Sequence, residues 1–269
     1  MSASGSFTDY CEAQLLNHLF GGMPYNFPQI LYFGYMVGVP GETGPGAEPN
    51  FGSYERVAVT NNTVNFPITT TQSKTNATEI TFEEATANHG LVQALGVWDS
   101  PVAGNLLCYF PLANPINISA SDAMKIPPAS LTFGFQAGGM SNYVKNAFLN
   151  ALFGGSPFNL IPIIYVGYST TAPTDAAPGA EPAVGGYSRV QVANSAQMFP
   201  TSSTGVKLNA LDINFPEATA SQGTVTHIQF FDSLSGGNYL GRYALAPVQA
   251  ISQYTIPVLG TNTIQITLD

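Results

Sequence analysis

The chain has 269 residues, of which 45% are hydrophobic and only 9% are charged, and its formal net charge is −9. This hydrophobic content excludes a disordered chain, and the lack of a basic patch in the sequence argues against nucleic-acid binding. No apolar run of about 18 residues is present, so membrane insertion is not expected.

A repeat with constant spacing organises the sequence. Tyr54-Glu55-Arg56-Val57 recurs 133 residues later as Tyr187-Ser188-Arg189-Val190. The same spacing, without an insertion, relates Phe20-Gly21-Gly22 to Phe153-Gly154-Gly155, Gly46-Ala47-Glu48 to Gly179-Ala180-Glu181, and Asp99-Ser100 to Asp232-Ser233. We therefore expect a tandem duplication, in which each unit has the usual size of a domain and can bury its own core.

The expected domains are a first β-rich repeat, 1–136, and a second, 140–269, joined by a linker at about 136–139. Charge divides unevenly between them. Residues 1–135 carry three basic and ten acidic side chains, net −7, whereas residues 136–269 carry four and six, net −2. A short linker keeps the two units close together.

Each repeat begins with a predicted short helix. Apolar residues follow helical spacing in 9–20 and again in 142–153. Thr8 or Asp9 is suited to cap the first helix and Ser141 the second, and a Gly-Gly pair ends each. We interpret each helix as a lid on the sheet of its own repeat, and a partner-binding element is the alternative.

The remainder of each repeat is predicted to be strand and turn. Strands are expected at 28–35, 54–59, 79–82, 92–98, 106–110 and 131–135, and at the same spacing in the second repeat. Segments 38–51 and 171–185 are long Gly/Pro/Ala loops, and 60–78 and 193–211 are polar connections. The predicted fold class is mainly β: two tandem β-sandwich-like domains, each with one short N-terminal α-helix.

A glutamate in each long loop recurs near the arginine of each Tyr-x-Arg strand. We expect an Arg–Glu ion pair to hold the loop against the strand, and a loop held in this way can also serve as a contact surface. The structural or contact candidates are Glu48, Tyr54 and Arg56 in the first repeat, and Glu181, Tyr187 and Arg189 in the second.

Residue patterns typical of catalysis are weak. The histidines His18, His89 and His227 do not recur between repeats, which argues against a metal cluster in either copy. A triad using His227 and Asp232 lacks a GxSxG nucleophile turn. We expect no cofactor, no metal and no enzymatic activity.

Other residues that could carry chemistry have plainer interpretations. Glu83 and Glu84 are adjacent, so on a strand they point to opposite faces instead of across one cleft. Trp98 replaces Phe231 and is interpreted as a core packing residue.

Cys11 and Cys108 occur in the first repeat only, which favours free thiols in a reducing compartment. The N-terminus lacks the pattern of a secretory signal, so we expect a protein made in the cytosol.

The second repeat carries several short motifs in a fixed order: Tyr165-Val166-Gly167-Tyr168, Gly185-Gly186-Tyr187-Ser188-Arg189-Val190, Gly223-Thr224-Val225-Thr226-His227 and Phe231-Asp232. Through them, residues 142–269 resemble a family of small virion proteins of tailed bacteriophages, described as tail-fibre or structural proteins. The first repeat resembles the family less closely, because Val92-Gln93-Ala94 and the loop 36–44 depart from the pattern.

The resemblance implies a virion component assembled in the cytoplasm of the bacterial host. Because short-period fibre repeats and heptads are missing, our first prediction is a capsid decoration (cement) protein that braces neighbouring major capsid subunits. The alternative is a tail-fibre, baseplate or other tail-associated structural protein. Expected partners are the major capsid protein or tail proteins of the same virion, with self-association. A carbohydrate-binding module is a further hypothesis, with Tyr25, Tyr35, Tyr54, Tyr168 and Tyr187 as candidates.

Overall fold

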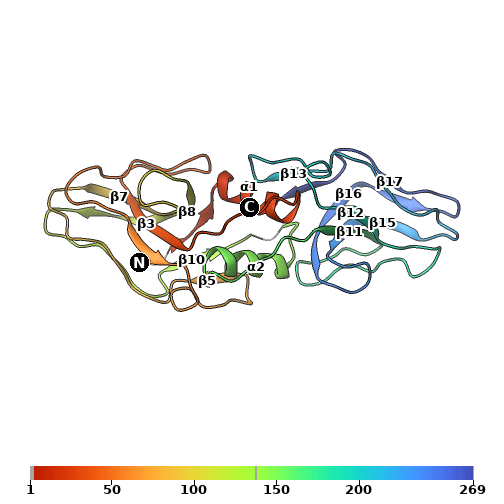
Figure 1. Ribbon diagram of the computed structural model, residues 1–269, viewed down its shortest axis with the longest axis horizontal. Helices are drawn as coiled ribbons and strands as arrows, with labels where there is room; N and C mark the ends of the chain where they lie inside the picture. The colour runs from red at the N-terminus through yellow and green to blue at the C-terminus, as the bar shows by residue number, and fades with distance from the viewer. Residues whose placement is uncertain (1–2, 137, 269) are drawn as a thin grey trace.

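The computed structural model describes residues 3–136 and 138–268. Met1, Ser2, Ala137 and Asp269 lie outside them, so the outermost residues of the predicted repeats and one residue of the predicted linker are not described. Figure 1 shows an elongated molecule with the sheets of the first repeat at one end, those of the second at the other, and both helices in the middle. Within the described residues, neither helix is long and apolar enough to cross a membrane.

The two repeats contain corresponding elements. The first has β1 (Ala3–Ser4), β2 (Ser6–Phe7), α1 (Asp9–Leu19), β3 (Ile30–Met36), β4 (Val57–Thr60), β5 (Ser73–Thr75), β6 (Ile80–Thr81), β7 (Gly90–Trp98), β8 (Leu106–Ile118), β9 (Lys125–Ile126) and β10 (Leu131–Gly134). The second has α2 (Asn142–Leu152), β11 (Ile163–Ser169), β12 (Val190–Ala193), β13 (Val206–Leu208), β14 (Ile213–Asn214), β15 (Gly223–Phe231), β16 (Tyr239–Ile251), β17 (Val258–Leu259) and β18 (Gln265–Thr267).

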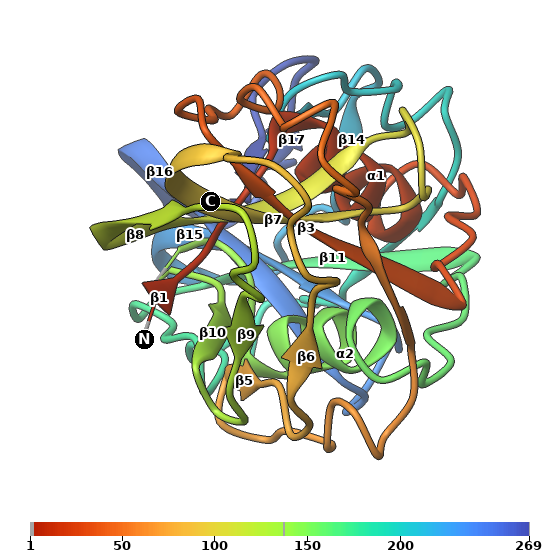
Figure 2. The ribbon, with the colours of Figure 1, turned by 90° about the vertical axis from the view of Figure 1, so that its left-hand side faces the viewer.

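One large antiparallel sheet dominates each repeat. Its strand order is β2-β8-β7-β3-β4 in the first repeat and β12-β11-β15-β16 in the second. In Figure 2, the short strands β5, β6, β9 and β10 lie on one side of β3, β7 and β8, with α2 beside them. The fold is therefore mainly β with two tandem sandwich-like units, each with one N-terminal helix, as predicted from the sequence.

Alternating side chains of the central strands build the core. In β3, Leu31, Phe33 and Tyr35 are each at most 2% exposed. Both cysteine thiols are free, as predicted, and both are buried in this core. Burial raises the pKa of the Cys108 thiol well above its usual range, so the thiol stays protonated.

Both helices begin where the sequence predicted. The Thr8 hydroxyl accepts a hydrogen bond from the backbone N–H of Cys11 at 3.4 Å, and the Ser141 hydroxyl accepts one from Val144 at 3.2 Å. Each helix ends at a Phe-Gly-Gly sequence in which the second glycine, Gly22 or Gly155, has a φ of 63°. A glycine adopts this left-handed conformation without steric cost, which lets the helix stop abruptly.

The interpretation of the helices as lids on their own sheets is only partly right. Near its start, α1 contacts β8 of its own repeat, but it also packs against β13 of the second repeat. In return, α2 contacts β16 of its own repeat and both β5 and β10 of the first. The apolar stripe predicted a buried helix face, but such a stripe does not specify which copy of the sheet covers it.

Two strands lie in stretches that were predicted to be polar connections. These are β5 and β13, and the central residue of each is a buried lysine, Lys74 or Lys207. A lysine at an inward position makes a strand look solvent-exposed in the sequence, and for this reason the alternation was missed.

Candidate functional site

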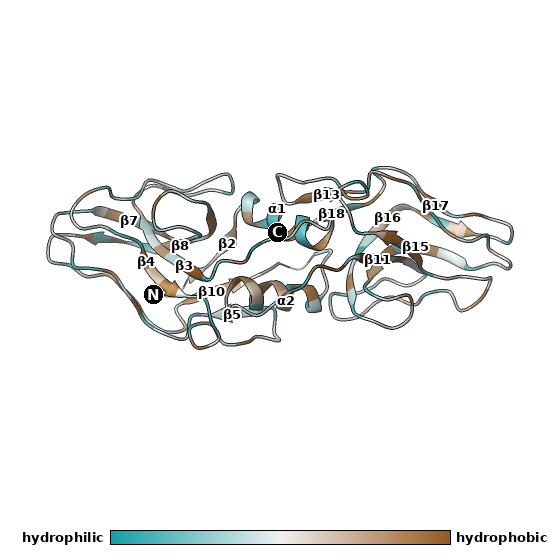
Figure 3. Cartoon of the chain, in the orientation of Figure 1, coloured by the Kyte–Doolittle hydropathy of each residue, from teal (hydrophilic) through white to brown (hydrophobic). Residues whose placement is uncertain are grey.

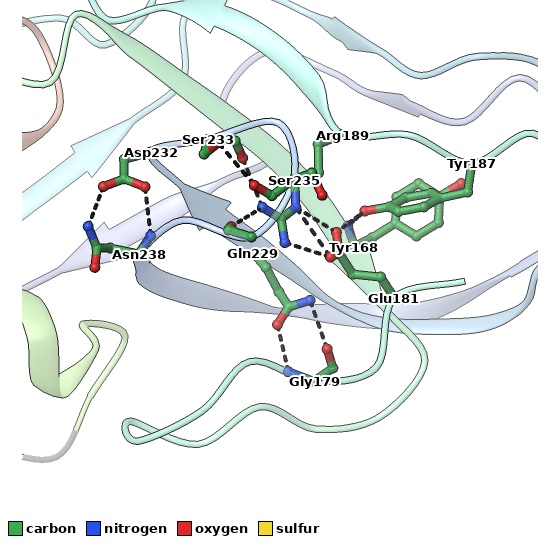
Figure 4. Close-up of polar contacts among 11 residues, drawn as sticks. Tyr168, Gly179, Glu181, Tyr187, Arg189, Gln229, Asp232, Ser233, Ser235 and Asn238 are labelled. Carbon is green, nitrogen blue, oxygen red and sulfur yellow. Dashed lines mark hydrogen bonds and ion pairs between the residues drawn. The ribbon is translucent and has the colours of Figure 1, made fainter. Parts of the chain in front are cut away.

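The six residues predicted as a structural or contact set form one cluster in each repeat. Figure 4 shows the cluster of the second repeat, in which Nε of Arg189 donates to Oε1 of Glu181 at 3.0 Å and Nη2 donates to Oε2 at 2.7 Å. The Tyr187 hydroxyl donates to the same Oε1 at 2.5 Å and accepts from the backbone N–H of Tyr168 at 3.1 Å. The loop carrying Glu181 is thus joined to the start of β12 and to β11.

The remaining guanidinium nitrogen joins the cluster to the turn after β15. Nη1 of Arg189 donates to the carbonyl oxygens of Ser233 and Gly236, both at 2.8 Å. The guanidinium carbon also lies 3.3 Å from the centroid of the Phe231 ring, which gives a cation–π contact. One arginine therefore holds together a long loop, a turn and two strands.

The first repeat has the same cluster. Nε and Nη2 of Arg56 donate to Glu48 at 3.0 and 2.5 Å, and Nη1 donates to the carbonyl oxygens of Ser100 and Ala103 at 2.8 and 2.7 Å. The guanidinium carbon lies 4.0 Å from the centroid of Trp98, which is fully buried. Trp98 therefore occupies the packing position of Phe231, as its alignment with that residue suggested.

The electrostatics of both clusters favour a stable, closed network. The arginine side chains are 7% and 8% exposed, and their glutamate partners 20% and 24%. Burial, together with the hydrogen bond to the glutamate, raises the pKa of Tyr54 and of Tyr187 far above the usual range. Both phenols remain protonated donors, so the clusters present bonded groups instead of a reactive nucleophile.

A groove of about 550 Å³ lies beside the first cluster. It is lined by Glu48, Pro49, Asn50, Tyr54, Glu55, Arg56, Pro101, Val102 and Ala103. Val102 at its rim is 79% exposed. The loop that carries Glu48 forms part of this groove, and its role as a contact surface stays a prediction.

The tyrosines considered for glycan binding do not form an exposed platform. Tyr35 and Tyr168 are each 2% exposed, and the Tyr25 hydroxyl is buried. The rings of Tyr54 and Tyr187 pack edge-on against Tyr35 and Tyr168, with centroids 4.7 Å apart in both pairs. Sugar recognition by stacking needs an open ring face, and these rings contribute to the core instead.

His89 has a structural role that a glutamine fills in the other repeat. Its Nδ1 is 2.7 Å from the Tyr35 hydroxyl and its Nε2 is 2.8 Å from the carbonyl oxygen of Gly52. At the equivalent position, Gln222 accepts a hydrogen bond from the Tyr168 hydroxyl and donates to a backbone carbonyl oxygen at 2.8 Å. A histidine that a glutamine replaces in this way bonds as an amide does, with one hydrogen bond on each side of the side chain.

The structure does not bring the imagined triad partners together. His227 and Asp232 are five residues apart along and just past β15, which corresponds to roughly 17 Å at the rise of a strand. Both carboxylate oxygens of Asp232 are bonded to Asn238, each at 2.6 Å. His227 interacts with the Thr226 hydroxyl at 2.9 Å.

The contact between the repeats, which sequence reasoning missed, lies in the middle of the molecule. We call it the waist: α1, α2 and the Gly-Gly segments after them, with residues 61–74 and 194–207 that they reach. Figure 3 shows hydrophilic segments within α1 although the helix lies in the middle of the molecule. These polar residues are bonded across the repeat boundary.

Asn17 of α1 is bonded to the second repeat through three interactions. Its Nδ2 donates to the carbonyl oxygen of Ser202 at 3.0 Å, and its Oδ1 accepts from the Ser202 N–H at 2.9 Å and from Nζ of Lys207 at 2.5 Å. Lys207 is 1% exposed, and this desolvation lowers the pKa of its ammonium group to about 8.

Asn150 of α2 makes the equivalent bonds to the first repeat. Its Nδ2 donates to the carbonyl oxygen of Thr69 at 3.0 Å, and its Oδ1 accepts from the Thr69 N–H and from Nζ of Lys74, both at 2.9 Å. Lys74 is 3% exposed, and desolvation lowers its pKa to about 8 as well. Asn146 adds a bond to the N–H of Gln72 at 2.8 Å.

A second pair of asparagines fixes the helix ends. Asn194 accepts from the N–H of Gly21 at 2.6 Å and donates to the carbonyl oxygen of Leu19 at 2.8 Å. Asn61 accepts from the N–H of Gly154 at 2.5 Å and donates to the carbonyl oxygen of Leu152 at 3.1 Å. Each asparagine thus satisfies backbone groups that a helix end leaves without partners.

The sequence did contain a signal for the waist. Asn17, Asn61, Lys74 and Gly22 all recur unchanged at the 133-residue spacing, although surface residues between the repeats differ widely. Identical polar residues at matching positions suggest a polar contact made twice.

A protein-family model described as "Podophage GP4 fiber I protein gp80" matches residues 6–134 and again residues 139–267. The two matches begin at the equivalent segments that contain Phe7 and Met140 and end in β10 and β18. No curated protein matches the chain. Since the two matches cover nearly the whole sequence, the chain belongs to the family of the podophage GP4 fiber I protein gp80, as a tandem pair of its repeat.

Proposed function

We propose that this protein is a non-enzymatic structural component of a podophage tail, part of or attached to a fibre. The observation that carries the proposal is the double match to a fibre-protein family over residues 6–134 and 139–267. The elongated shape of the molecule and the contacts that join its two repeats at the waist support the proposal. A part that transmits force between two neighbours needs to be stiff along its length.

The family description favours a tail-associated role over the head-decoration role that was our first prediction from the sequence. That prediction rested on the compact repeats and the lack of short-period fibre patterns. A fibre can also be assembled from compact modules, each of which is bonded internally. Bracing of neighbouring major capsid subunits has no support from the family description, which names a fibre.

The bonds made by charged and histidine side chains support a non-enzymatic role. Arg56 and Arg189 use Nε, Nη1 and Nη2 in bonds within their own repeats, and Asp232 is bonded to Asn238. His18 donates through Nε2 to the carbonyl oxygen of Phe158 at 2.9 Å, while its Nδ1 accepts from the Tyr25 N–H. These groups hold loops and repeats in place.

The outer ends of the two repeats would bind different neighbours in the virion. The second repeat exposes Tyr254, Ile256 and Val258 to 75%, 56% and 43%. The first repeat, which carries most of the negative charge, has Ser121, Ala123 and Lys125 at those positions. The exposed apolar residues of the second repeat and their small or polar counterparts in the first suit two chemically distinct surfaces on adjacent virion proteins.

Immunogold labelling of intact virions, followed by cryo-electron microscopy, tests the proposal. We expect label and matching density on the tail or its fibres. Density confined to the surface of the head would reject the tail role and restore the decoration role. A purified protein that binds a glycan array with saturable signal would show instead that the protein is a glycan receptor-binding module.

A further inference from the structure

The waist has the symmetry of a homodimer. The main polar contact of α1 with the second repeat has a counterpart in a contact of α2 with the first, displaced by the same 133 residues. The bonds of Asn146 to Gln72 and of His18 to Phe158 have no such counterpart, because the equivalent helix residues are Ala13 and Ala151. Asn17 is hydrogen-bonded to Ser202 and Lys207. The equivalent residue, Asn150, is hydrogen-bonded to Thr69 and Lys74, which are the equivalents of Ser202 and Lys207. Such a reciprocal arrangement is that of a two-fold interface, in which the same patch of both partners is used twice.

In the apolar part of the waist, the pair Phe20 and Phe199 corresponds in the same way to the pair Phe153 and Phe66. The Phe20 ring at the end of α1 lies 5.4 Å from Phe199 and 5.3 Å from Phe230, both in the second repeat. The Phe153 ring at the end of α2 lies 4.0 Å from Phe133 and 5.9 Å from Phe66, both in the first. Each core is therefore completed by a phenylalanine from the other repeat.

The Gly-Gly segments allow this close approach. A Cβ atom on Gly22 would lie 2.3 Å from the carbonyl oxygen of Asn194, and one on Gly155 would lie 2.5 Å from that of Asn61. Both distances are well below van der Waals contact. The recurring glycines thus fit the backbone of the opposite repeat as well as ending their helices.

The contacts at the waist do not depend on the covalent link between the two repeats. The segment that joins the two cores runs from Phe135, which stacks on Phe7, to Met140, which bridges to Gly241. Gln136, Met140 and Leu268 line a small cavity of about 140 Å³. The helix contacts do not pass through this connection, so two separate chains could make all of them.

We propose that the waist is a self-association surface whose partner is a second copy of the repeat. A repeat completes its core by exchanging its N-terminal helix with another repeat, and this chain joins such a pair covalently. The exchange is the reason that the repeat is found as two interlocked copies instead of two independent domains. When the two repeats of one chain are separated, the same surface can pair repeats from different chains.

The full-length protein can test this after a single cut. A protease site inserted between Gly138 and Gly139 allows the folded chain to be cut in its linker. We expect the cut protein to elute from a sizing column with the uncut protein and to keep its circular dichroism. Halves that separate into monomers and keep their folded spectra would overturn the proposal.

An exchange experiment tests whether separate copies pair. Tagged and untagged samples of the cut protein are unfolded together in urea, refolded and examined by native mass spectrometry. The proposal predicts pairs with mixed tags, including pairs of two second repeats, because each repeat has both the donor helix and the acceptor core. If only first-with-second pairs form, the claim that a repeat pairs with its own kind is wrong.

A matched variant links the pairing to the asparagines. Asn17→Ala combined with Asn150→Ala removes the helix side of both polar contacts and should raise the dissociation constant of the cut halves at least about tenfold. Gln14→Ala is the control, because it lies on the same helix and the second repeat already has Ala147 there. Equal dissociation constants for the two variants would contradict the assigned role of the asparagines.

Discussion

The waist and the outer ends of the molecule differ in how far the two repeats have diverged. At the waist the repeats keep several buried polar residues, with Asn17 matching Asn150 and Lys74 matching Lys207, although other helix positions differ, as His18 and Ala151 do. The side chains there face each other, so a change in one repeat must fit the equivalent surface of the other. This mutual constraint explains the identity of the buried polar residues.

At the outer ends the residues differ in polarity and charge. Tyr254 and Ile256 of the second repeat replace Ser121 and Ala123 of the first. Nothing in the fold couples these positions to each other, because they lie in the outer parts of opposite repeats. Under the proposed function, the waist holds the chain together and the ends contact other virion proteins. The predictions below separate these roles.

The largest effect is expected at the waist. Phe153→Ala should lower the free energy of unfolding by about 3–5 kcal/mol, because it empties a buried ring site in the core of the other repeat. Urea denaturation followed by circular dichroism measures this loss. Ile256→Ala at the outer end is the control, and it should change stability by no more than about 0.5 kcal/mol. Equal losses in both variants would remove the distinction between waist and end.

The arginine clusters should stabilise each repeat without acting on the waist. Arg189→Ala leaves Glu181 with the Tyr187 hydroxyl but without its guanidinium partner, and leaves two carbonyl groups without their donor, so we expect a loss of about 2–3 kcal/mol in unfolding free energy. In the cut protein, however, the affinity between the halves should stay unchanged. The exposed pair of Lys125 and Glu79 provides the control, and Lys125→Ala should give no measurable change. A weakened association of the halves after Arg189→Ala would show that the cluster acts beyond its repeat.

The buried lysines should make the waist more stable at alkaline pH. The desolvated folded state lowers the pKa of Lys74 and of Lys207 from 10.5 to about 8. Below pH 8 the two lysines are protonated in both the folded and the unfolded state. Folding then carries the full free-energy cost of burying their charge. Between pH 8 and 10.5 the folded state releases its proton first, so stability rises with pH.

Lys74→Met and Lys207→Met isolate this effect from other titrating groups, such as tyrosines and cysteines. At pH 7 each variant should be more stable than the unaltered protein by roughly 1–2 kcal/mol, since the buried charge is gone. That advantage should shrink as the pH is raised from 8 to 10, as measured by denaturation at each pH. An advantage that stays constant over this range would mean that the lysines do not titrate in it.

Local features of the fold were predictable from the sequence because local chemistry determines them. Thr8 and Ser141 cap their helices as expected, and Glu48 bonds to Arg56 as its spacing suggested. The exchange of helices was not predictable in this way. A buried stripe such as Leu15, Leu16 and Leu19 is satisfied equally by the sheet of either repeat. Only the geometry of the whole chain selects the neighbouring copy.

The polar residues of the waist were missed for a related physical reason. A buried asparagine or lysine has the same appearance in the sequence as a solvated one, because its partner is distant in the sequence: 76 positions separate Lys74 from Asn150, and 190 separate Lys207 from Asn17. The arginine clusters were found because their ion-pair partners are only eight residues apart. Sequence reasoning therefore identified the contacts within a repeat and missed those between repeats.

The smallest effect on stability is expected at the outer end of the second repeat. Tyr254→Ser, Ile256→Ala and Val258→Lys give this end the residues of the first repeat. Tyr254 and Ser121 share a left-handed backbone, with φ of 66° and 72°, so the change is compatible with the local fold. We expect stability within about 0.5 kcal/mol of the unaltered protein but a clear loss of incorporation into virions, because an exposed apolar surface is replaced.

Quantitative mass spectrometry of purified virions measures this incorporation. The reciprocal Lys125→Val variant is the control, because it changes the first repeat at the equivalent position and leaves the apolar end intact. If both variants enter virions at the level of the unaltered protein, the difference between the two ends has no role in attachment. If the first variant alone is lost while remaining folded, then the divergence of the repeats reflects the two different surfaces that they contact.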